Sequence, residues 1–300
     1  MELPLPFRER MKQMLGDEYG EFLESYDRER SQGLRLNLLK TGREEFLAKT
    51  SFMLEPIPWA ESGFYYQPQD RPGRHPYHEA GVYYIQEPSA MAPAAYLTRQ
   101  MADGAGERIL DLCAAPGGKS LHMAEKLNGS GCVEARDLTE YKVGLIQENI
   151  ERTGLSNVEA VQQDALIFDE TSVGKADIVL ADLPCSGLGV LAKKTDLKYK
   201  ATKEGADSLA KLQREMLKNV QAYVKDEGKL VYSTCTINPA ENMDNVHWFL
   251  NEYPEFELID IHGSLCEELQ KDVKENGCIQ LLPGVHQSDG FFLACMKKRK

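Results

Sequence analysis

Two cysteines occupy positions from which they could perform covalent chemistry. Cys185 lies in segment 182–187 (DLPCSG) and Cys235 lies in segment 233–236 (STCT), and each segment directly follows an apolar run typical of a strand. In an open α/β sheet the residues at the carboxyl ends of the strands line the ligand crevice, so we expect both thiols in one crevice. Two thiols there indicate covalent catalysis, in which one cysteine attacks and the other assists or resolves.

A loop of small residues follows a third apolar run, 108–113 (RILDLC). Glycines let the backbone approach a ligand closely, and the amide groups at the start of the next helix face that ligand. The pattern is not GxGxxG, so a site for the pyrophosphate of a dinucleotide is not implied. We predict a loop for a nucleotide-like cofactor, formed by Cys113, Ala114, Ala115, Pro116, Gly117, Gly118 and Lys119.

Aspartates stand at the ends of the next two predicted strands, Asp137 at the second and Asp164 at the third. A carboxylate at the first position can bind ribose hydroxyls, and one at the second can accept a hydrogen bond from an exocyclic amine. Each aspartate alone has an ordinary explanation as a turn former or helix cap. Their places at successive strand ends favour a binding site, and the missing phosphate cradle favours S-adenosylmethionine over NAD.

The other cysteines and the histidines give no metal site and no disulfide framework. The seven cysteines are scattered and include no CxxC pair. We expect Cys113 to be a packing residue, and the small buried hydrophobes to be Cys132, Cys266, Cys278 and Cys295. A metal site at His75 and His78 is the weakest interpretation, because the segment is rich in proline and lacks i, i+4 helical spacing. We predict no metal.

The net charge of −12 argues against a broadly basic surface. Phosphate binding needs only a local patch, however, and a lysine-rich stretch follows the Cys185 segment directly. The residues predicted to bind nucleic-acid phosphates are Lys193, Lys194, Lys198 and Lys200, with Lys203 close behind. The basic C-terminus at 297–300 is expected to be ordinary solvated surface.

The length of 300 residues predicts one large domain and a smaller one. Apolar spacing predicts a helix over 5–30 and a short helix over 44–49, and alternation predicts a strand over 34–39. Residues 56–88 are rich in proline and aromatic side chains, and we interpret them as a turn-rich domain junction.

From residue 108 onwards, strand and helix patterns alternate, which predicts a parallel, doubly wound α/β sheet. The predicted strands are 108–113, 131–137, 158–163, 177–183, 228–235, 256–261 and 290–297. The predicted helices are 118–127, 140–153, 204–225 and 239–252. The last helix begins with a capping pattern, in which Asn238 precedes Pro239 and Glu241 stands third.

No apolar run approaches the length of a membrane span, and the N-terminus lacks the basic and apolar regions of a signal peptide. Hydrophobic residues make up 42% and charged residues 27% of the chain, which is typical of a globular enzyme. We therefore expect a cytoplasmic protein with no membrane partner. In the absence of any signal for assembly, we expect a monomer.

Three segments resemble the RNA cytosine-5 methyltransferases of the RsmB/Nop2/Sun family. They are 111–120 (DLCAAPGGKS), 182–190 (DLPCSGLGV) and 232–242 (YSTCTINPAEN). Flanking motifs of the family are resembled by 35–40 (RLNLLK), 83–91 (YYIQEPSAM) and 289–293 (DGFFL). The resemblance therefore covers essentially the whole chain.

The resemblance implies a Rossmann-like class I methyltransferase fold with a mostly parallel sheet and a small α+β N-terminal domain. It implies an RNA-docking domain at 1–85, a methyltransferase domain at 86–300 and S-adenosylmethionine as cofactor. Segments 56–59 and 63–65 favour the RsmF-like branch, which acts on small-subunit ribosomal RNA. That branch usually continues into C-terminal RNA-binding domains, so the sequence is either a piece of a longer protein or a compact member.

The resemblance also implies a role for each reactive residue. Cys235 is expected to add to C6 of cytosine, Asp182 to contact the N3 edge and line the cofactor site, and Cys185 to assist release as a base or through one. Lys119 is expected to lower the thiolate pKa or orient the base, with a surface lysine at a helix start as the alternative. In DNA cytosine-5 methyltransferases the Pro-Cys cysteine attacks, whereas here a second thiol is present. A transfer RNA substrate and a non-catalytic RNA-binding assembly factor remain alternatives.

Overall fold

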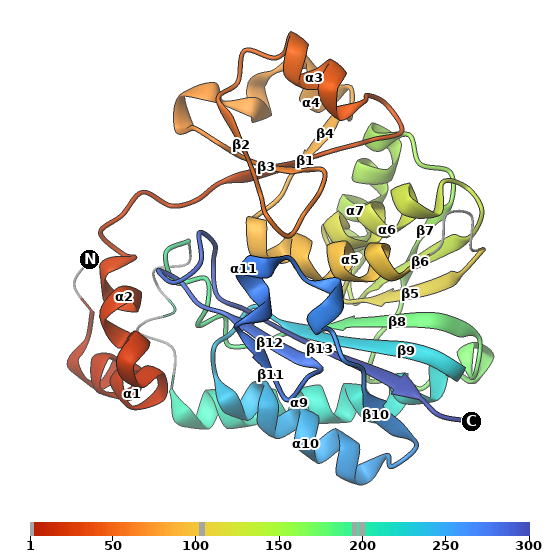
Figure 1. Cartoon of the computed structure of the whole chain (residues 1–300). Helices are drawn as coiled ribbons and strands as arrows, with labels where there is room; N and C mark the ends of the chain where they lie inside the picture. Colours follow the sequence, from red (N-terminus) through yellow and green to blue (C-terminus); the bar gives the residue numbers. More distant parts are fainter. Residues whose placement is uncertain (1–2, 102–105, 194–196, 198–201) are drawn as a thin grey trace.

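A small antiparallel sheet stands above a large central sheet in the computed structural model, which describes residues 3–101, 106–193, 197 and 202–300 (Figure 1). The central sheet has nine strands, in the order β11-β12-β13-β9-β8-β5-β6-β7, with β10 paired to β13. These strands are β5 (Arg108–Leu112), β6 (Cys132–Asp137), β7 (Val158–Gln162), β8 (Ala176–Asp182), β9 (Val224–Thr234), β10 (Phe256–Leu258), β11 (Val273–Lys274), β12 (Cys278–Leu281) and β13 (Phe291–Lys298).

The chain order of the strands reverses between β5 and β8. From β5 the chain moves outward through β6 and β7, and it then returns to place β8 on the other side of β5, followed by β9; all four pairings are parallel. Ligands of such sheets bind at the reversal point, beyond the carboxyl ends of the strands. The predicted doubly wound, mostly parallel sheet is therefore confirmed. The pairings of β10, β11, β12 and β13 are antiparallel.

Helices cover both faces of the central sheet, because alternate strand residues point to opposite faces. Ile109, Ile178 and Val231 face a core shared with α5, α6 and α7, whereas Leu110 and Val179 face a core shared with α9 and α10. The helices are α5 (Pro88–Gln100), α6 (Gly118–Leu127), α7 (Glu140–Thr153), α9 (Lys203–Val220), α10 (Met243–Glu252) and the short α11 (Glu267–Gln270). The bounds predicted for α6 and α7 are confirmed.

Two helices near the C-terminal half depart from the prediction. The helix α9 ends at Val220, and β9 begins at Val224, earlier than the sequence indicates. The helix predicted from residue 239 is only a 3₁₀ turn at Pro239–Glu241, and α10 begins at Met243. The predicted capping was wrong, because neither Asn238 nor Asn242 makes a side-chain cap and Glu241 binds other partners, described below.

Residues 56–88 are rich in turns, as predicted, but they are more than a junction, because β3 and β4 also lie in this segment. This segment supplies much of a four-stranded sheet with the order β2-β3-β1-β4. The sheet and the short helices between its strands are β1 (Gly33–Leu36), α3 (Arg43–Lys49), β2 (Leu54–Pro56), β3 (Gly63–Tyr66), α4 (Pro76–Glu79) and β4 (Tyr83–Ile85). Proline hid the pattern, because Pro56 ends an edge strand and other prolines start short helical turns between strands, at Pro68–Asp70 and Pro72–Arg74.

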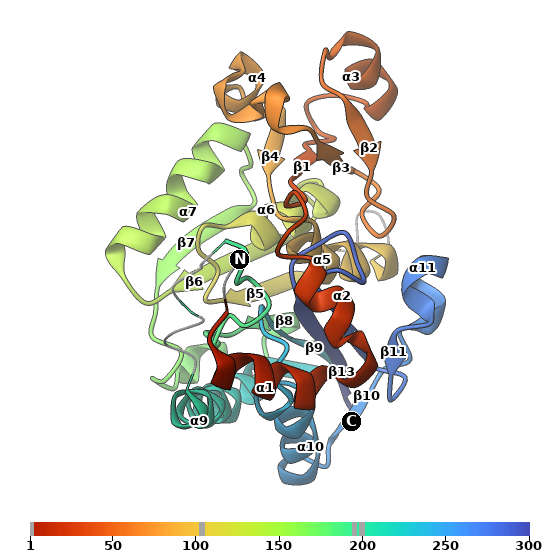
Figure 2. The same cartoon turned by 90° about the vertical axis from the view of Figure 1, so that its left-hand side faces the viewer.

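The N-terminal helical segment packs against the loops that follow β8 and β9. The helix predicted over 5–30 divides into α1 (Leu5–Leu15) and α2 (Tyr19–Glu24), joined at Gly16, whose φ of 54° breaks the helix. Figure 2 shows both helices on the side facing the viewer. Phe7, Met11, Leu15 and Phe22 form one apolar cluster with Leu188, Leu191, Ile237 and Leu282. None of the described helices is long and apolar enough to cross a membrane.

Candidate active site

The structure brings Cys185 and Cys235 together at the carboxyl ends of neighbouring parallel strands. In the register of β8 and β9, Asp182 lies opposite Ser233, so the segments that continue beyond these residues leave the sheet side by side. The two sulfur atoms are 3.1 Å apart and hydrogen-bonded. Both cysteines are partly buried, and neither forms a disulfide. The expected meeting of the two thiols in one crevice is therefore confirmed.

The contact between the thiols keeps Cys185 protonated. The hydrogen bond to Cys235 is the main cause that raises the pKa of Cys185 well above its ordinary value, and burial and charge repulsion from Cys235 add to it. Cys185 therefore holds its proton, which it can donate towards the Cys235 sulfur. A thiol donor 3.1 Å away stabilises negative charge on Cys235, which suits Cys235 to nucleophilic attack.

Lys119 and Asp182 form an ion pair at the point where the strand order reverses. Lys119 lies in the first turn of α6, after β5, and its Nζ donates to Asp182 Oδ2 at 2.5 Å. Ser233 donates to the other oxygen of Asp182 at 2.7 Å. Burial lowers the pKa of Lys119, but the attraction and hydrogen bond of Asp182 outweigh it, so that the net shift is upward. Only 15% of the Lys119 side chain is exposed, so the alternative of a surface lysine is wrong.

A buried carboxylate that the sequence analysis did not identify holds the two cysteine loops together. Glu241 is fully buried and accepts hydrogen bonds from the amide and hydroxyl of Ser186, at 2.8 and 2.5 Å. It also accepts from Gln213 at 3.2 Å and from Asn238 at 2.9 Å. Ser186 follows Cys185 and also bonds to the hydroxyl of Thr236, which follows Cys235. Glu241 therefore fixes the backbone beside both thiols.

The predicted cofactor loop folds against Asp137. The amide of Ala115 donates to Asp137 Oδ2 at 3.0 Å, and the amide of Leu138 donates to Oδ1 at 2.7 Å. Lys142 lies 3.0 Å from Oδ1. Gly117 has a φ of 104°, which favours glycine at the turn into α6.

The remaining loop residues line the same turn. Ala114 donates its amide to the Arg136 carbonyl at 2.9 Å, and the Pro116 carbonyl accepts from Asn149 at 3.0 Å. Burial raises the pKa of Cys113 to about 12, so this cysteine is a thiol at neutral pH, and it packs against the core on the α9 face.

The residues at the ends of β5, β6 and β7 fit an adenosine-containing cofactor. A carboxylate has about four lone-pair sites, so Asp137 keeps acceptor capacity for a ribose hydroxyl beyond its three protein partners. Asp164 uses Oδ1 to accept from the Leu166 amide at 2.9 Å. Leu138 and Ile167 follow neighbouring strands and are 53% and 62% exposed, which provides apolar surface for a planar ring. The sequence analysis did not identify these two residues, although their positions one and three residues after the acids could have indicated them.

Two carboxylates, Glu87 and Asp289, border the loop that carries Cys185. The amide of Asp289 donates to Glu87 at 2.7 Å, and Arg30 lies 3.4 Å from the Asp289 carboxylate. Burial, together with the charge of Asp289, raises the pKa of Glu87 to about 7. The next residue, Gly290, donates to the carbonyl of Gly189 at 2.8 Å, and the Gly189 amide donates to the carbonyl of Cys235 at 3.1 Å. The sequence analysis missed Glu87 as a site residue.

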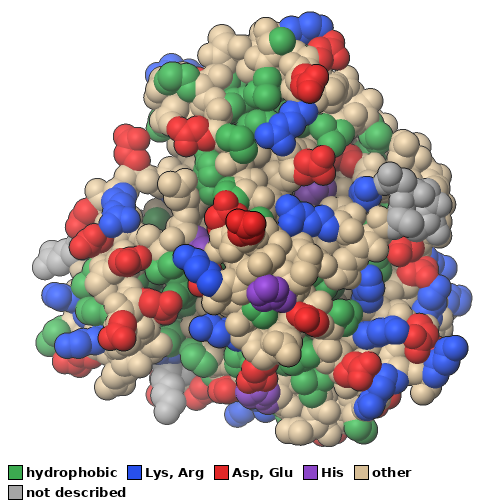
Figure 3. Space-filling view, viewed as in Figure 1, with side chains coloured by type: hydrophobic (Ala, Val, Ile, Leu, Met, Phe, Trp, Pro, Cys, Tyr) green, Lys and Arg blue, Asp and Glu red, His purple; other side chains and the backbone are tan. Residues whose placement is uncertain are grey.

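The predicted lysine patch is described only in part. Lys193 is exposed, and its charge acts on Asp289. Lys194, Lys198 and Lys200 lie outside the described residues. Acidic and basic side chains are interspersed over the face in Figure 3, so this face is not uniformly basic.

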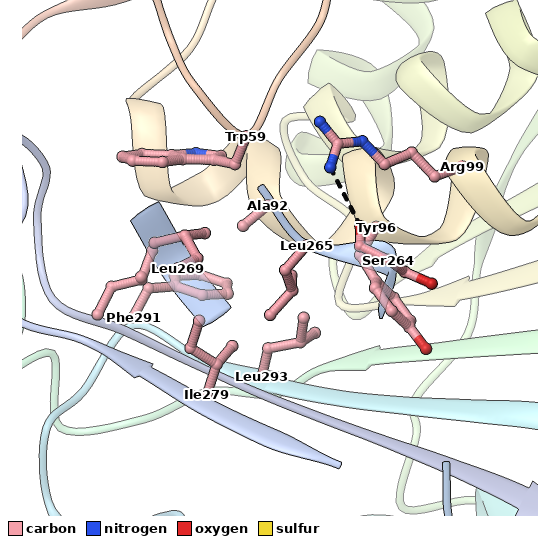
Figure 4. Close-up of a pocket in the computed structure, with 11 residues that line it drawn as sticks. Trp59, Ala92, Tyr96, Arg99, Ser264, Leu265, Leu269, Ile279, Phe291 and Leu293 are labelled. Carbon is pink, nitrogen blue, oxygen red and sulfur yellow. Dashed lines mark hydrogen bonds between the residues drawn. The ribbon is translucent and has the colours of Figure 1, made fainter. Parts of the chain in front are cut away.

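A further pocket in the described part of the chain is apolar and carries no reactive group. It lies between α5, the segment around α11 and the strands β12 and β13, with Trp59 of the N-terminal half on one side (Figure 4). Arg99 closes one end by donating to the Ser264 carbonyl at 3.1 Å. Phe291 lines the pocket, and its ring centroid lies 5.6 Å from the Lys119 nitrogen. Phe291 therefore connects this pocket with Lys119 of the active site through packing.

The histidines of segment 75–78 do not form a metal site within the described residues, where no cluster of three or more metal-ligating side chains occurs. His75 caps α4 by accepting from the Tyr77 amide at 3.2 Å, and His78 contacts Glu79. Both histidines therefore have structural partners.

Comparisons with known proteins give consistent matches along the chain. A family model described as 16S rRNA methyltransferase RsmB/F matches residues 99–297, and one described as the N-terminal domain of 16S rRNA methyltransferase RsmF matches residues 3–88. Ribosomal RNA small subunit methyltransferase F of Escherichia coli O157:H7 is 34% identical in an alignment of 289 residues that covers 93% of this chain. The chain spans 60% of the length of that relative.

Two crystal structures share the fold over nearly the whole chain. The structure of PH0851 has a TM-score of 0.88 and 29% identity, and the match covers 99% of this chain and 66% of that one. A methyltransferase homolog protein from Pyrococcus horikoshii has a TM-score of 0.79 and 28% identity, covering 97% of this chain and 93% of that one.

Proposed function

This chain belongs to the 16S rRNA methyltransferase RsmB/F family, and we propose that it methylates C5 of a cytosine in small-subunit ribosomal RNA. The family uses S-adenosylmethionine as its cofactor. The observation that carries the proposal is the pair of thiols 3.1 Å apart, beside the Lys119–Asp182 ion pair. Cytosine C5 is a poor nucleophile, and a pair of thiols can overcome this in two steps.

In the first step, the Cys235 thiolate adds to C6 of the cytosine. The new S–C6 bond turns C5 into an enamine-like carbon, which carries the electron density needed for methylation. Cys185 donates its hydrogen bond to the Cys235 sulfur before the attack and so favours the thiolate. The role of Cys235 as nucleophile is supported by the raised pKa of Cys185, which keeps the neighbouring thiol protonated beside it.

Asp182 and Lys119 stabilise the charge that develops on the pyrimidine. Asp182 is held by Lys119 and Ser233, and 23% of its side chain is exposed towards the crevice. From there it can pass the proton that it shares with Lys119 to N3, where electron density accumulates as Cys235 adds to C6. Fixed charges and donors of this kind need no reorganisation during the reaction, which is why they lower its barrier.

In the last step, C5 must lose its proton and the S–C6 bond must break. Removal of the proton forms the C5–C6 double bond and expels Cys235 as a thiolate. While Cys235 is bonded to C6 it carries no negative charge, so its charge repulsion no longer raises the pKa of Cys185. Cys185 can then lose its own proton more readily and accept the C5 proton, directly or through another base. The two cysteines thus act in sequence.

The cofactor supplies an electrophilic methyl group. We propose that loop 113–119 and the start of α6 hold its methionine part, that Asp137 binds the ribose and that Asp164 lies at the adenine. Lys142 stands beside Asp137 and orients its carboxylate. Leu138 and Ile167 are proposed to contact the adenine ring.

The target cytosine must be unpaired or flipped out to reach the thiols. We propose that the N-terminal domain, residues 1–85, docks the RNA, and that Lys193 with the lysines after it contacts the phosphates. Glu87 and Asp289 border the loop that carries Cys185, and we propose that they help to hold this loop against the base. An rRNA substrate implies that the protein acts in the cytoplasm.

Methyl transfer to purified RNA tests the proposal. RNA from cells that lack the protein should accept labelled methyl groups from S-adenosylmethionine, and bisulfite mapping should locate the label at one cytosine of small-subunit RNA. Label in transfer RNA alone would assign the alternative substrate. Cofactor binding without transfer to any of these RNAs would refute the enzyme assignment and favour the assembly factor.

A further inference from the structure

We infer that Arg35 is a positioning residue, which fixes the first turn of α6 and thereby the Lys119 side chain and the cofactor loop. The inference rests on the proposed function, because it assigns Arg35 to the same reaction. Arg35 lies in β1 of the small N-terminal sheet, outside the strands that carry the reactive residues.

The guanidinium of Arg35 joins three segments. Its Nε donates to Gln86 Oε1 at 3.2 Å, one terminal nitrogen pairs with Glu125 of α6, and the other donates to the Gly118 carbonyl at 3.4 Å. The Arg35 side chain has no exposed area, and that of Glu125 is 7% exposed. Gly118 directly precedes Lys119. The contact therefore reaches the backbone of the turn that carries the lysine.

The same turn is packed tightly against the N-terminal half of the chain. A Cβ added at Gly118 would lie 3.0 Å from Tyr84 Cε1 and 3.2 Å from Gln86 Nε2. The first turn of α6 is thus held by a hydrogen bond from Arg35 and by contact with the residues in and after β4. The Lys119–Asp182 bond at 2.5 Å depends on the position of this turn, because the lysine reaches across to the end of β8.

A second contact between the same parts of the chain provides a control. Lys40 follows β1 and donates to the carbonyls of Ala80 and Arg152, at 2.6 and 3.1 Å. Arg152 lies in the last turn of α7, at the opposite end of that helix from the cofactor side. Loss of the Lys40 contact weakens the junction but leaves the first turn of α6 with all its partners.

The substitution Arg35→Lys separates positioning from simple charge pairing. Lysine keeps a positive charge opposite Glu125, but its single nitrogen cannot reproduce the fork that reaches Gln86 and Gly118 together. If Arg35 served only to neutralise Glu125, lysine would be an adequate replacement.

The experiment compares the wild type with Arg35→Lys, Lys40→Met and Gly118→Ala by methyl-transfer kinetics and by amide hydrogen exchange without substrate. We expect Arg35→Lys to lower kcat roughly tenfold, since small misplacements of catalytic groups cost one to two orders of magnitude. The KM for RNA should stay unchanged. Exchange of the Leu121 amide, which bonds to the Gly117 carbonyl, should become faster. Lys40→Met should match the wild type in Leu121 exchange.

Gly118→Ala displaces the same turn, so it should show the same loss of kcat and the same faster exchange. This variant keeps the inference testable if Arg35→Lys does not fold. Wild-type kcat and exchange in the Arg35→Lys variant would overturn the inference, as would equally fast Leu121 exchange in Lys40→Met. A wild-type protein without methyl transfer would refute the proposed function instead, and the exchange data would still decide the role of Arg35.

Discussion

Replacement of Glu241 tests whether one buried carboxylate holds the two cysteine loops. Glu241→Ala removes the acceptor of four hydrogen bonds, from two groups of Ser186 and from Gln213 and Asn238. At about 1 kcal/mol for each bond, the free energy of unfolding should fall by about 4 kcal/mol. Glu241→Gln keeps one acceptor oxygen, and the Ser186 hydroxyl and the Asn238 amide can reorient towards the new amino group, so the loss should be about 1–3 kcal/mol.

The assay is thermal unfolding together with methyl-transfer kinetics. A change of 1 kcal/mol shifts the Tm of a protein of this size by about 2–4 °C, so Glu241→Ala should unfold about 8–16 °C lower and Glu241→Gln should lie between it and the wild type. The kcat of Glu241→Gln should fall, whereas its affinity for the cofactor should hold, because the cofactor loop lies at β5 and β6. Glu215→Gln is the control, since Glu215 pairs with Lys218 on the surface and its side chain is 59% exposed. A Tm of Glu241→Ala equal to that of the control would refute the reasoning.

Three further predictions concern stability and cofactor binding. Burial raises the pKa of Asp111 to about 7, above its unfolded value of about 3.9, so the folded state retains this proton and loses stability as the pH rises from about 4 to 7. Asp111→Asn, measured by urea unfolding, should therefore gain up to about 4 kcal/mol over the wild type across that range, and a constant difference would contradict the shift. Phe22 is 1% exposed in the cluster that covers both cysteine loops. Phe22→Ala should therefore lower the free energy of unfolding by about 3–5 kcal/mol and lower kcat. Unchanged urea unfolding would show that α2 does not pack there. Asp137→Asn should weaken binding of S-adenosylmethionine by about 1–3 kcal/mol in calorimetry, and wild-type affinity would remove Asp137 from the site.

Local sequence signals predicted the elements that carry most of the site. Helix α7 begins after Thr139, whose hydroxyl accepts from the Lys142 amide, and it ends at Gly154 with a φ of 74°. Such start and stop signals involve neighbouring residues, so the sequence contains them. Strand ends after apolar runs likewise placed Asp137, Asp182 and both cysteines correctly at one edge of the sheet.

The residues that sequence reasoning missed have distant partners. Glu87 binds Asp289, 202 positions away, and Arg35 binds Glu125, 90 positions away. Glu241 lies 55 positions from Ser186, and its local pattern indicated a helix cap instead. No spacing rule connects such pairs before the fold is known. The strand predicted over 34–39 overlaps β1, but the other strands of the N-terminal sheet, three or four residues long, escaped prediction because alternation over so few residues is no signal.

Covalent trapping of RNA by the two cysteine variants tests the central claim most directly. Each variant reacts with RNA that carries the target cytosine, in the presence of S-adenosylmethionine. Denaturing electrophoresis then resolves the covalent protein–RNA complex. Cys235→Ala should form no complex and transfer no methyl group, whereas Cys185→Ala should accumulate the complex because release is blocked. The reverse result, a complex with Cys235→Ala and none with Cys185→Ala, would make Cys185 the nucleophile and contradict the assignment.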